Sequence, residues 1–182
     1  MEASLLEFVL LGLLDQGACS GYDLRKLFAA SPLRNFSDSP GAIYPALRRL
    51  AGRGWIEGQE PGGARKRQLF AIHGRGRAAL GAWLRQDVLP DDILRPELLL
   101  LRFAFMGQIL RREEALAFLA EFEQHLVPYV ASLEAYFAAN AATFPLTGRL
   151  SFACGLGDYR AKLQWLQEAK RAVATSEKWP LQ

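Results

Sequence analysis

Two clusters of basic residues in the first half of the chain have the composition of a surface that binds anions. Arg48 and Arg49 lie near the end of the segment SPGAIYPALRRL, residues 39–50, about one helical turn after Tyr44. Guanidinium groups pair with phosphate oxygens and guanine edges, and a phenol can donate a hydrogen bond to a phosphate. A second cluster, the Arg-Lys-Arg run at residues 65–67, follows a Pro-Gly-Gly turn. We therefore expect this half of the chain to bind a long, regular anion, of which double-stranded DNA is the obvious example.

Residues that could carry catalysis or hold a metal are few. Cys19 and Cys154 lie far apart and belong to no CxxC pair, and the two histidines, His73 and His125, add no cluster of ligands. No nucleophile can be assembled with an acid–base pair, which covalent catalysis needs. We therefore expect no catalytic activity, no metal and no cofactor.

Charge is distributed unevenly along the 182 residues, whose formal net charge is +3. Residues 1–85 carry twelve Lys or Arg against seven Asp or Glu, whereas residues 86–182 carry ten against twelve. A basic half joined to a mildly acidic half suggests a division of labour in which the first half binds the anionic partner. The segment LPDDILRP, residues 89–96, marks the change. We therefore predict two domains, 1–88 and 89–182.

The most apolar stretches, residues 5–14 and 98–110, are too short to cross a bilayer and are interrupted by Glu7 and Arg102. The N-terminus has neither the basic segment nor the small-residue cleavage site of a signal peptide. These features predict no membrane partner and a cytoplasmic location.

The periodicity of residues 39–52 predicts a helix with one buried face, because Ile43, Leu47 and Leu50 recur at i, i+4 and i+7. The outward face combines two arginines, a phenol at its edge and backbone made accessible by glycine. On a helical wheel it carries Gly41, Tyr44, Pro45, Arg48 and Arg49.

Pro45 interrupts this helix, because an interior proline lacks the N–H that would donate to the carbonyl four residues earlier. The proline lies on the exposed side, where a distortion costs the core little. If the helix begins near Ala42, Pro45 falls where the backbone N–H is unpaired in any helix. We therefore expect Pro45 to stiffen a helix start whose free N–H groups and arginines attract phosphate.

Two short helices should precede this segment. Ser4 followed by Glu7 is a capping-box pattern, which opens a helix that runs to Gly17. A second helix is expected from Ser20 to about Ala30. Its predicted buried stripe comprises Leu24, Leu27 and Phe28.

Residues 55–60 and 65–72 have the pattern of two antiparallel strands joined by the PGGA turn, and residues 74–88 return to helix. This order of elements is that of a winged helix-turn-helix, in which the second helix of the pair enters the major groove. The later helices are expected at residues 97–110, 112–140 and 151–174. The predicted fold is mainly α: an α+β winged helix-turn-helix followed by an all-helical C-terminal dimerisation domain.

Three segments resemble the PadR family of bacterial transcriptional regulators. They are GLLDQGACSGYDLRKLF (12–28), SPGAIYPALRRLAGRGWIE (39–57) and GRGRAAL (74–80). The resemblance spans residues 6–84, and its most specific part is Gly21–Tyr22 upstream of Ser39–Leu50. The Tyr-Pro pair in the latter segment is typical of the family's recognition helix. The chain departs from the family at His73, where threonine is usual, and at Leu69–Phe70, where tyrosines are frequent.

The resemblance implies a regulator of transcription, and we expect a repressor that acts as a homodimer on a double-stranded DNA operator. Two copies are expected because one recognition helix reads only a half-site. The acidic second half is similar to the longer PadR subfamily, whose C-terminal helices build the dimer. We also expect regulation by a small-molecule effector, a possible partner whose identity the sequence does not specify.

The residues expected to face DNA come from the start of the second helix, the recognition helix at about 39–52 and the basic wing at about 55–72. They are Tyr22, Ser39, Gly41, Ala42, Tyr44, Pro45, Arg48, Arg49, Arg65, Lys66 and Arg67.

Two other classes of function fit the sequence less well. A winged-helix module that binds another protein, and never DNA, is the alternative, but such a module should lack the outward cations at residues 48–49 and 65–67. A small enzyme on a helical scaffold would need a constellation of reactive side chains that the sequence does not offer.

Overall fold

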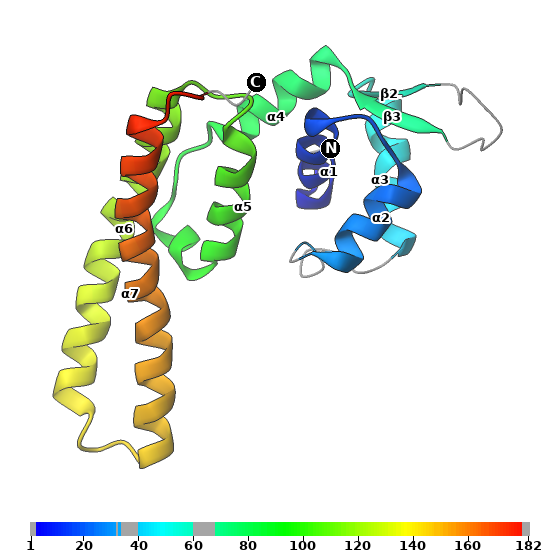
Figure 1. Ribbon diagram of the computed structural model, residues 1–182. Helices are drawn as coiled ribbons and strands as arrows, with labels where there is room; N and C mark the ends of the chain where they lie inside the picture. Colours follow the sequence, from blue (N-terminus) through cyan, green and yellow to red (C-terminus); the bar gives the residue numbers. More distant parts are fainter. Residues whose placement is uncertain (1–2, 32, 34–39, 60–67, 180–182) are drawn as a thin grey trace. The chain divides into compact units, whose positions relative to one another are not determined.

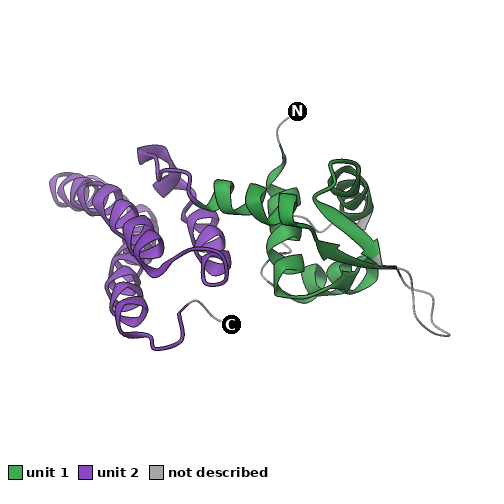
Figure 2. Cartoon of the chain, turned by 90° about the horizontal axis from the view of Figure 1, so that it is seen from above, with its two compact units in different colours: residues 1–84 green, residues 85–182 purple. Residues whose placement is uncertain are grey.

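A computed structural model of the chain describes residues 3–31, 33, 40–59 and 68–179. The chain divides into two compact units, residues 1–84 and residues 85–182 (Figure 2). The fold is mainly helical with one small sheet in the first unit, as the sequence predicted (Figure 1).

The first unit is a winged helix. Its helices are α1 (Leu5–Gln16), α2 (Gly21–Ala30), α3 (Pro40–Gly52) and α4 (Gly74–Leu84). Its strands are β1 (Cys19–Ser20), β2 (Ile56–Gln59) and β3 (Leu69–Ile72), which pair antiparallel in the order β1-β3-β2. The strand β1 was not predicted. It has only two residues, and its pairing with Phe70 and Leu69 defines it.

The capping box of α1 is confirmed. The backbone N–H of Glu7 donates to Ser4 Oγ at 3.3 Å, and the Ser4 N–H donates to Glu7 Oε2 at 2.7 Å. All residues from Val9 to Leu14 are buried, as expected for a short helix so rich in apolar residues. The helix α1 packs against α3, β3 and α4, and the Phe8 ring stacks on Trp83 of α4 at 4.9 Å between centroids.

The predicted stripe of α2 is wrong at one position. Leu24 and Phe28 are buried, but Leu27 is 43% exposed. Leu27 lies about 100° from Phe28 around the helix axis, because consecutive helical residues are separated by that angle. The neighbours of α2, which are α3 and β1, cover the side that carries Leu24 and Phe28.

The helix α3 ends in a glycine motif that turns the chain into β2. Gly54 has a φ of 68°, a left-handed conformation that glycine adopts without strain. The Gly54 N–H donates to the Ala51 carbonyl at 2.9 Å, and the Trp55 N–H donates to the Leu50 carbonyl at 3.0 Å. This pair of bonds is the Schellman arrangement, which satisfies the last carbonyls of a helix.

The second unit is entirely helical in its described residues. It contains the 3-10 helix η2 (Pro90–Leu94), α5 (Pro96–Met106), α6 (Arg112–Asn140) and α7 (Leu146–Thr175). The long helices α6 and α7 lie side by side as an antiparallel pair (Figure 1). The sequence placed the start of the last helix at residue 151, five residues later than Leu146. Among the described helices, none combines the length and apolar character that crossing a bilayer requires.

Two side chains of α6 accept hydrogen bonds from the start of the second unit. Arg85 Nε donates to Glu114 Oε1 at 2.7 Å, and this hydrogen bond is the main cause that lowers the pKa of Glu114 to about 2. The Val88 N–H donates to Glu121 Oε2 at 3.1 Å. Along the chain, the division between the compact units falls after Leu84, whereas the sequence placed the domain boundary at residue 88. The assignment of functions to the two domains stays a prediction.

Candidate DNA interface

The helix α3 has the buried and outward faces that its periodicity predicted. Ile43, Leu47 and Leu50 are at most 1% exposed and pack into the core of the first unit. Tyr44 is 44% exposed, and Arg48, one turn later, is also exposed. The buried leucines and isoleucine therefore fix the rotation of α3, and this rotation presents Tyr44 and Arg48 to solvent.

The expected place of Pro45 in the helix is wrong. Because α3 begins at Pro40, Pro45 lies more than one turn inside the helix, beyond the positions whose N–H groups are unpaired. The proline therefore removes the helical partner of the Gly41 carbonyl. Gly41 is exposed, so water can solvate that carbonyl, which reduces the cost of the missing bond.

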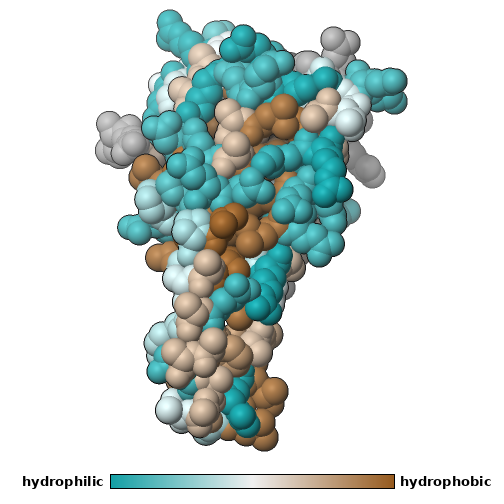
Figure 3. Space-filling model, turned by 90° about the vertical axis from the view of Figure 1, so that its left-hand side faces the viewer, coloured by the Kyte–Doolittle hydropathy of each residue, from teal (hydrophilic) through white to brown (hydrophobic). Residues whose placement is uncertain are grey.

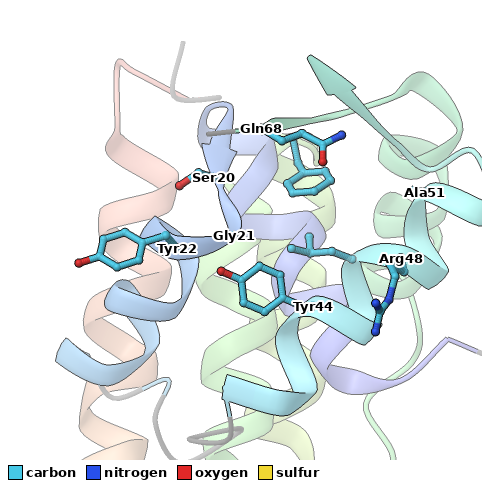
Figure 4. Close-up of a pocket in the computed structure, with 9 residues that line it drawn as sticks. Ser20, Gly21, Tyr22, Tyr44, Arg48, Ala51 and Gln68 are labelled. Carbon is cyan, nitrogen blue, oxygen red and sulfur yellow. The ribbon is translucent and has the colours of Figure 1, made fainter. Parts of the chain in front are cut away.

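An open cavity of about 530 Å³ lies between the start of α2, the outward face of α3 and strand β3 (Figure 4). Its apolar lining comes from Leu47, Phe70 and Ala51, and polar groups surround them. The polar lining residues are Ser20, Tyr22, Tyr44, Arg48 and Gln68, with Gly21 beside them. The cavity thus brings together three residues that the sequence predicted to face DNA, namely Tyr22, Tyr44 and Arg48.

Arg49 has a partner inside the first unit. Its Nε donates to Glu7 Oε1 at 2.7 Å, and Arg53 Nη1 lies 3.6 Å from the other carboxylate oxygen. Glu7 is 1% exposed, so these cations compensate a buried charge in α1. The side chain of Arg49 is still 47% exposed, and its contact with DNA stays a prediction.

The surroundings of Glu7 act on its pKa in opposite directions. Burial raises the pKa of Glu7, whereas the hydrogen bond from the Ser4 N–H and the two arginines lower it, and the net effect is a pKa below the usual value of 4.5. Because the folded pKa is the lower one, the ionised carboxylate stabilises the fold above pH 4.5. That contribution is lost as the pH falls through the folded pKa.

We expect Glu7→Gln to lower the free energy of unfolding by about 1–3 kcal/mol at pH 7, since charge-assisted hydrogen bonds are lost. The difference from the unsubstituted protein should shrink as the pH falls below 4.5. Urea unfolding followed by circular dichroism at several pH values measures both effects. Glu57→Gln is the matched control, because Glu57 is exposed on β2. A stability difference for Glu7→Gln that does not depend on pH would contradict this account of the ion pair.

Residues 10–82 match the family described as the transcriptional regulator PadR-like family. The first unit is a PadR-like domain. This match confirms the resemblance seen in the sequence. The domain contains α2, α3 and the cavity between them.

A curated relative is the negative transcriptional regulator PadR of Bacillus subtilis (strain 168). It is 29% identical over 113 residues, which are 60% of this chain and 60% of the relative. The match therefore spans less than two thirds of the relative's length.

Solved structures of Bacillus subtilis PadR are also similar. The complex with operator DNA is 22% identical and covers 93% of this chain and 99% of that one, with a TM-score of 0.43. The complex with p-coumaric acid is 19% identical and covers 94% and 96%, with a TM-score of 0.40.

Within the PadR-like domain, Tyr22 differs from Tyr44 and Arg48, the other two residues of the cavity that the sequence predicted to face DNA. Its ring points away from Tyr44 in Figure 4, and the guanidinium carbon of Arg25 lies 5.5 Å from the ring centroid. Tyr22 is 41% exposed. Ser39 and the wing residues Arg65, Lys66 and Arg67 lie outside the described residues.

Sequence reasoning missed Ser20 and Gln68 as cavity residues. Ser20 caps α2, since its Oγ accepts from the Asp23 N–H at 3.2 Å. Gln68 lines the cavity directly before β3, whose pairing with β1 the sequence did not predict.

Proposed function

We propose that the chain is a sequence-specific DNA-binding regulator of transcription, and that it acts as a repressor and a homodimer. The observation that carries this proposal is the outward face of α3 in a PadR-like domain, where Tyr44 and Arg48 project beside an open cavity. A solvent-exposed cation and phenol on a helix that is anchored by its apolar side suit insertion into the major groove.

Each side chain of this face has a separate role in the proposed complex. Arg48 is long enough to reach base edges, where a guanidinium can bind the O6 and N7 atoms of guanine. Tyr44 lies at the side of the helix and donates its hydroxyl to a backbone phosphate. Arg65, Lys66 and Arg67 of the wing contact neighbouring phosphates in this proposal.

The proposed repressor role rests on analogy with the relative from Bacillus subtilis, which is a negative transcriptional regulator. The proposed operator binding rests on the same analogy, because Bacillus subtilis PadR forms a complex with operator DNA. Bacillus subtilis PadR also forms a complex with p-coumaric acid, and by analogy we propose a small-molecule effector for this chain. We propose that the chain acts in the cytoplasm. The members of the matched family are regulators of transcription, and we propose no catalytic activity.

The second unit supports the proposed dimer. Large apolar side chains are exposed near the tip of the α6–α7 pair, where Tyr136, Leu146 and Leu150 are each more than 50% exposed. In Figure 3 the lower end of this pair is mostly pale tan, and brown hydrophobic atoms lie along one edge of it. Exposed apolar patches of this kind commonly mark protein–protein contacts. We therefore propose that α6 and α7 pair with those of a second copy.

Gel retardation of genomic DNA fragments, combined with light scattering, tests this function. We expect the full-length chain to scatter light with a mass of about 40 kDa, twice its 20.2 kDa, and to retard a subset of fragments at micromolar concentration. A monomer at micromolar concentration would contradict the homodimer. A folded dimer that retards no fragment would favour the protein-interaction module instead.

A further inference from the structure

The first residue of α2 is a glycine that the backbone does not require. Gly21 is helical, and among the described residues only Gly54 has a φ in the left-handed region. Glycine in the middle of a helix costs about 0.5–1 kcal/mol relative to alanine, because its unfolded chain has more freedom to lose, and the helical φ of Gly21 is one that alanine also adopts. Another feature of the surroundings must therefore explain why position 21 lacks a side chain.

The ring of Tyr44 occupies the space that a side chain at position 21 would need. A Cβ atom built on Gly21 would lie 2.6 Å from Tyr44 Cε1 and 3.3 Å from both Cδ1 and Cζ. Figure 4 shows the Tyr44 ring beside Gly21 at the edge of the cavity. The ring belongs to α3, so this contact joins the two helices of the helix-turn-helix at the proposed DNA-binding face.

We infer that Gly21 is a positioning residue for Tyr44, which holds the phenol at the start of α2 by leaving room for its ring. The atoms that a Cβ at position 21 would approach belong to the Tyr44 side chain, which can rotate, and not to the backbone. A helical tyrosine has two common χ1 rotamers, so the displaced ring moves to another rotamer and carries its hydroxyl several ångströms away. The consequence for DNA affinity rests on the proposed function, whereas the placement of the ring does not.

The variant Gly21→Ala tests this inference, and Gly74→Ala is its matched control. Gly74 is the first residue of α4, just as Gly21 is of α2, but nothing lies within 4 Å of a Cβ built on it. We expect Gly21→Ala to fold, with an unfolding midpoint at or above that of the unsubstituted protein. Its affinity for DNA should fall about 3–10-fold, the effect of losing one hydrogen bond, at every sequence alike. Gly74→Ala should bind DNA normally.

A double-mutant cycle separates positioning from a general structural effect. If Gly21 acts through Tyr44, adding Gly21→Ala to Tyr44→Ala should cause no further loss of affinity, because the obstructed ring is absent. A loss that persists undiminished in the Tyr44→Ala background would overturn the inference. Unchanged DNA affinity of the single Gly21→Ala variant would overturn the expected consequence for DNA binding.

Fluorine NMR of the chain labelled with 3-fluorotyrosine gives a readout that does not involve DNA. The chain has five tyrosines, and Tyr44→Phe identifies the resonance of Tyr44. We expect Gly21→Ala, but not Gly74→Ala, to shift that resonance. If the protein bound no DNA but Gly21→Ala still shifted the Tyr44 resonance, the positioning role would be supported and the proposed function would be contradicted. A Tyr44 resonance that Gly21→Ala leaves in place would overturn the inference whether or not DNA binds.

Discussion

Replacing Arg48 by alanine is expected to weaken binding to the preferred operator by about 1–3 kcal/mol and to relax the preference at one position of each half-site. The structure distinguishes Arg48 from its neighbour in this respect. Arg49 is bound to Glu7, whereas Arg48 has no ion-pair partner within the described part of the chain. An exposed guanidinium beside the cavity is available to read a base without first breaking an internal contact.

Tyr44→Phe is the comparison for this prediction, because it removes a hydroxyl at the edge of the same face. We expect it to weaken every sequence by a similar factor, since a phosphate contact carries no sequence information. Anisotropy titrations of the selected operator and its single-base variants, at one salt concentration, measure both effects. If Arg48→Ala weakens all sites equally and Tyr44→Phe changes the preference, the two roles must be exchanged.

Replacing Gly76 by alanine is expected to lower the free energy of unfolding by about 3 kcal/mol, the upper end of the usual cost of overpacking. A Cβ atom on Gly76 would lie 2.1 Å from the Trp55 carbonyl oxygen and 2.9 Å from its carbon. Both atoms belong to the backbone, and the same oxygen accepts the His73 N–H at 2.9 Å. The obstruction can be relieved only if α4 and the base of the hairpin move apart.

Gly74→Ala provides the control in the same helix, because open space surrounds that position. It should leave the stability unchanged or raise it by up to about 1 kcal/mol. Urea unfolding followed by circular dichroism compares the two variants. An unchanged unfolding midpoint for Gly76→Ala would show that the contact between α4 and Trp55 is not tight.

Local patterns in the sequence were sufficient to predict the buried side of α3 and the start of α1. The periodicity of Ile43, Leu47 and Leu50 was correct because a single stripe of that helix meets the core. The Ser4–Glu7 capping box was correct because both partners belong to the same turn. Features of this kind depend on neighbours in the chain and need no knowledge of the tertiary structure.

The features that the sequence did not predict depend on contacts between distant segments. The pairing of Arg49 with Glu7 joins residues 42 positions apart, and nothing near either residue indicates it. The exposure of Leu27 follows from which side of α2 meets α3 and β1. Gln68 lines the cavity next to strand β3, which lies far from α2 and α3 in the sequence. The reason for a glycine at position 21 depends on the ring of Tyr44, which lies 23 residues later in the chain.

Selection of bound sites from random duplex DNA by the full-length chain tests most directly whether α3 reads a DNA sequence. We expect the selected DNA to contain two inverted half-sites whose centres are separated by a multiple of about 10–10.5 base pairs, as a two-fold symmetric pair of recognition helices requires. The Arg48→Ala variant, selected in parallel, should recover the same half-sites with one position degenerate. A folded, dimeric chain that enriches no sequence over the starting library would contradict the proposed function.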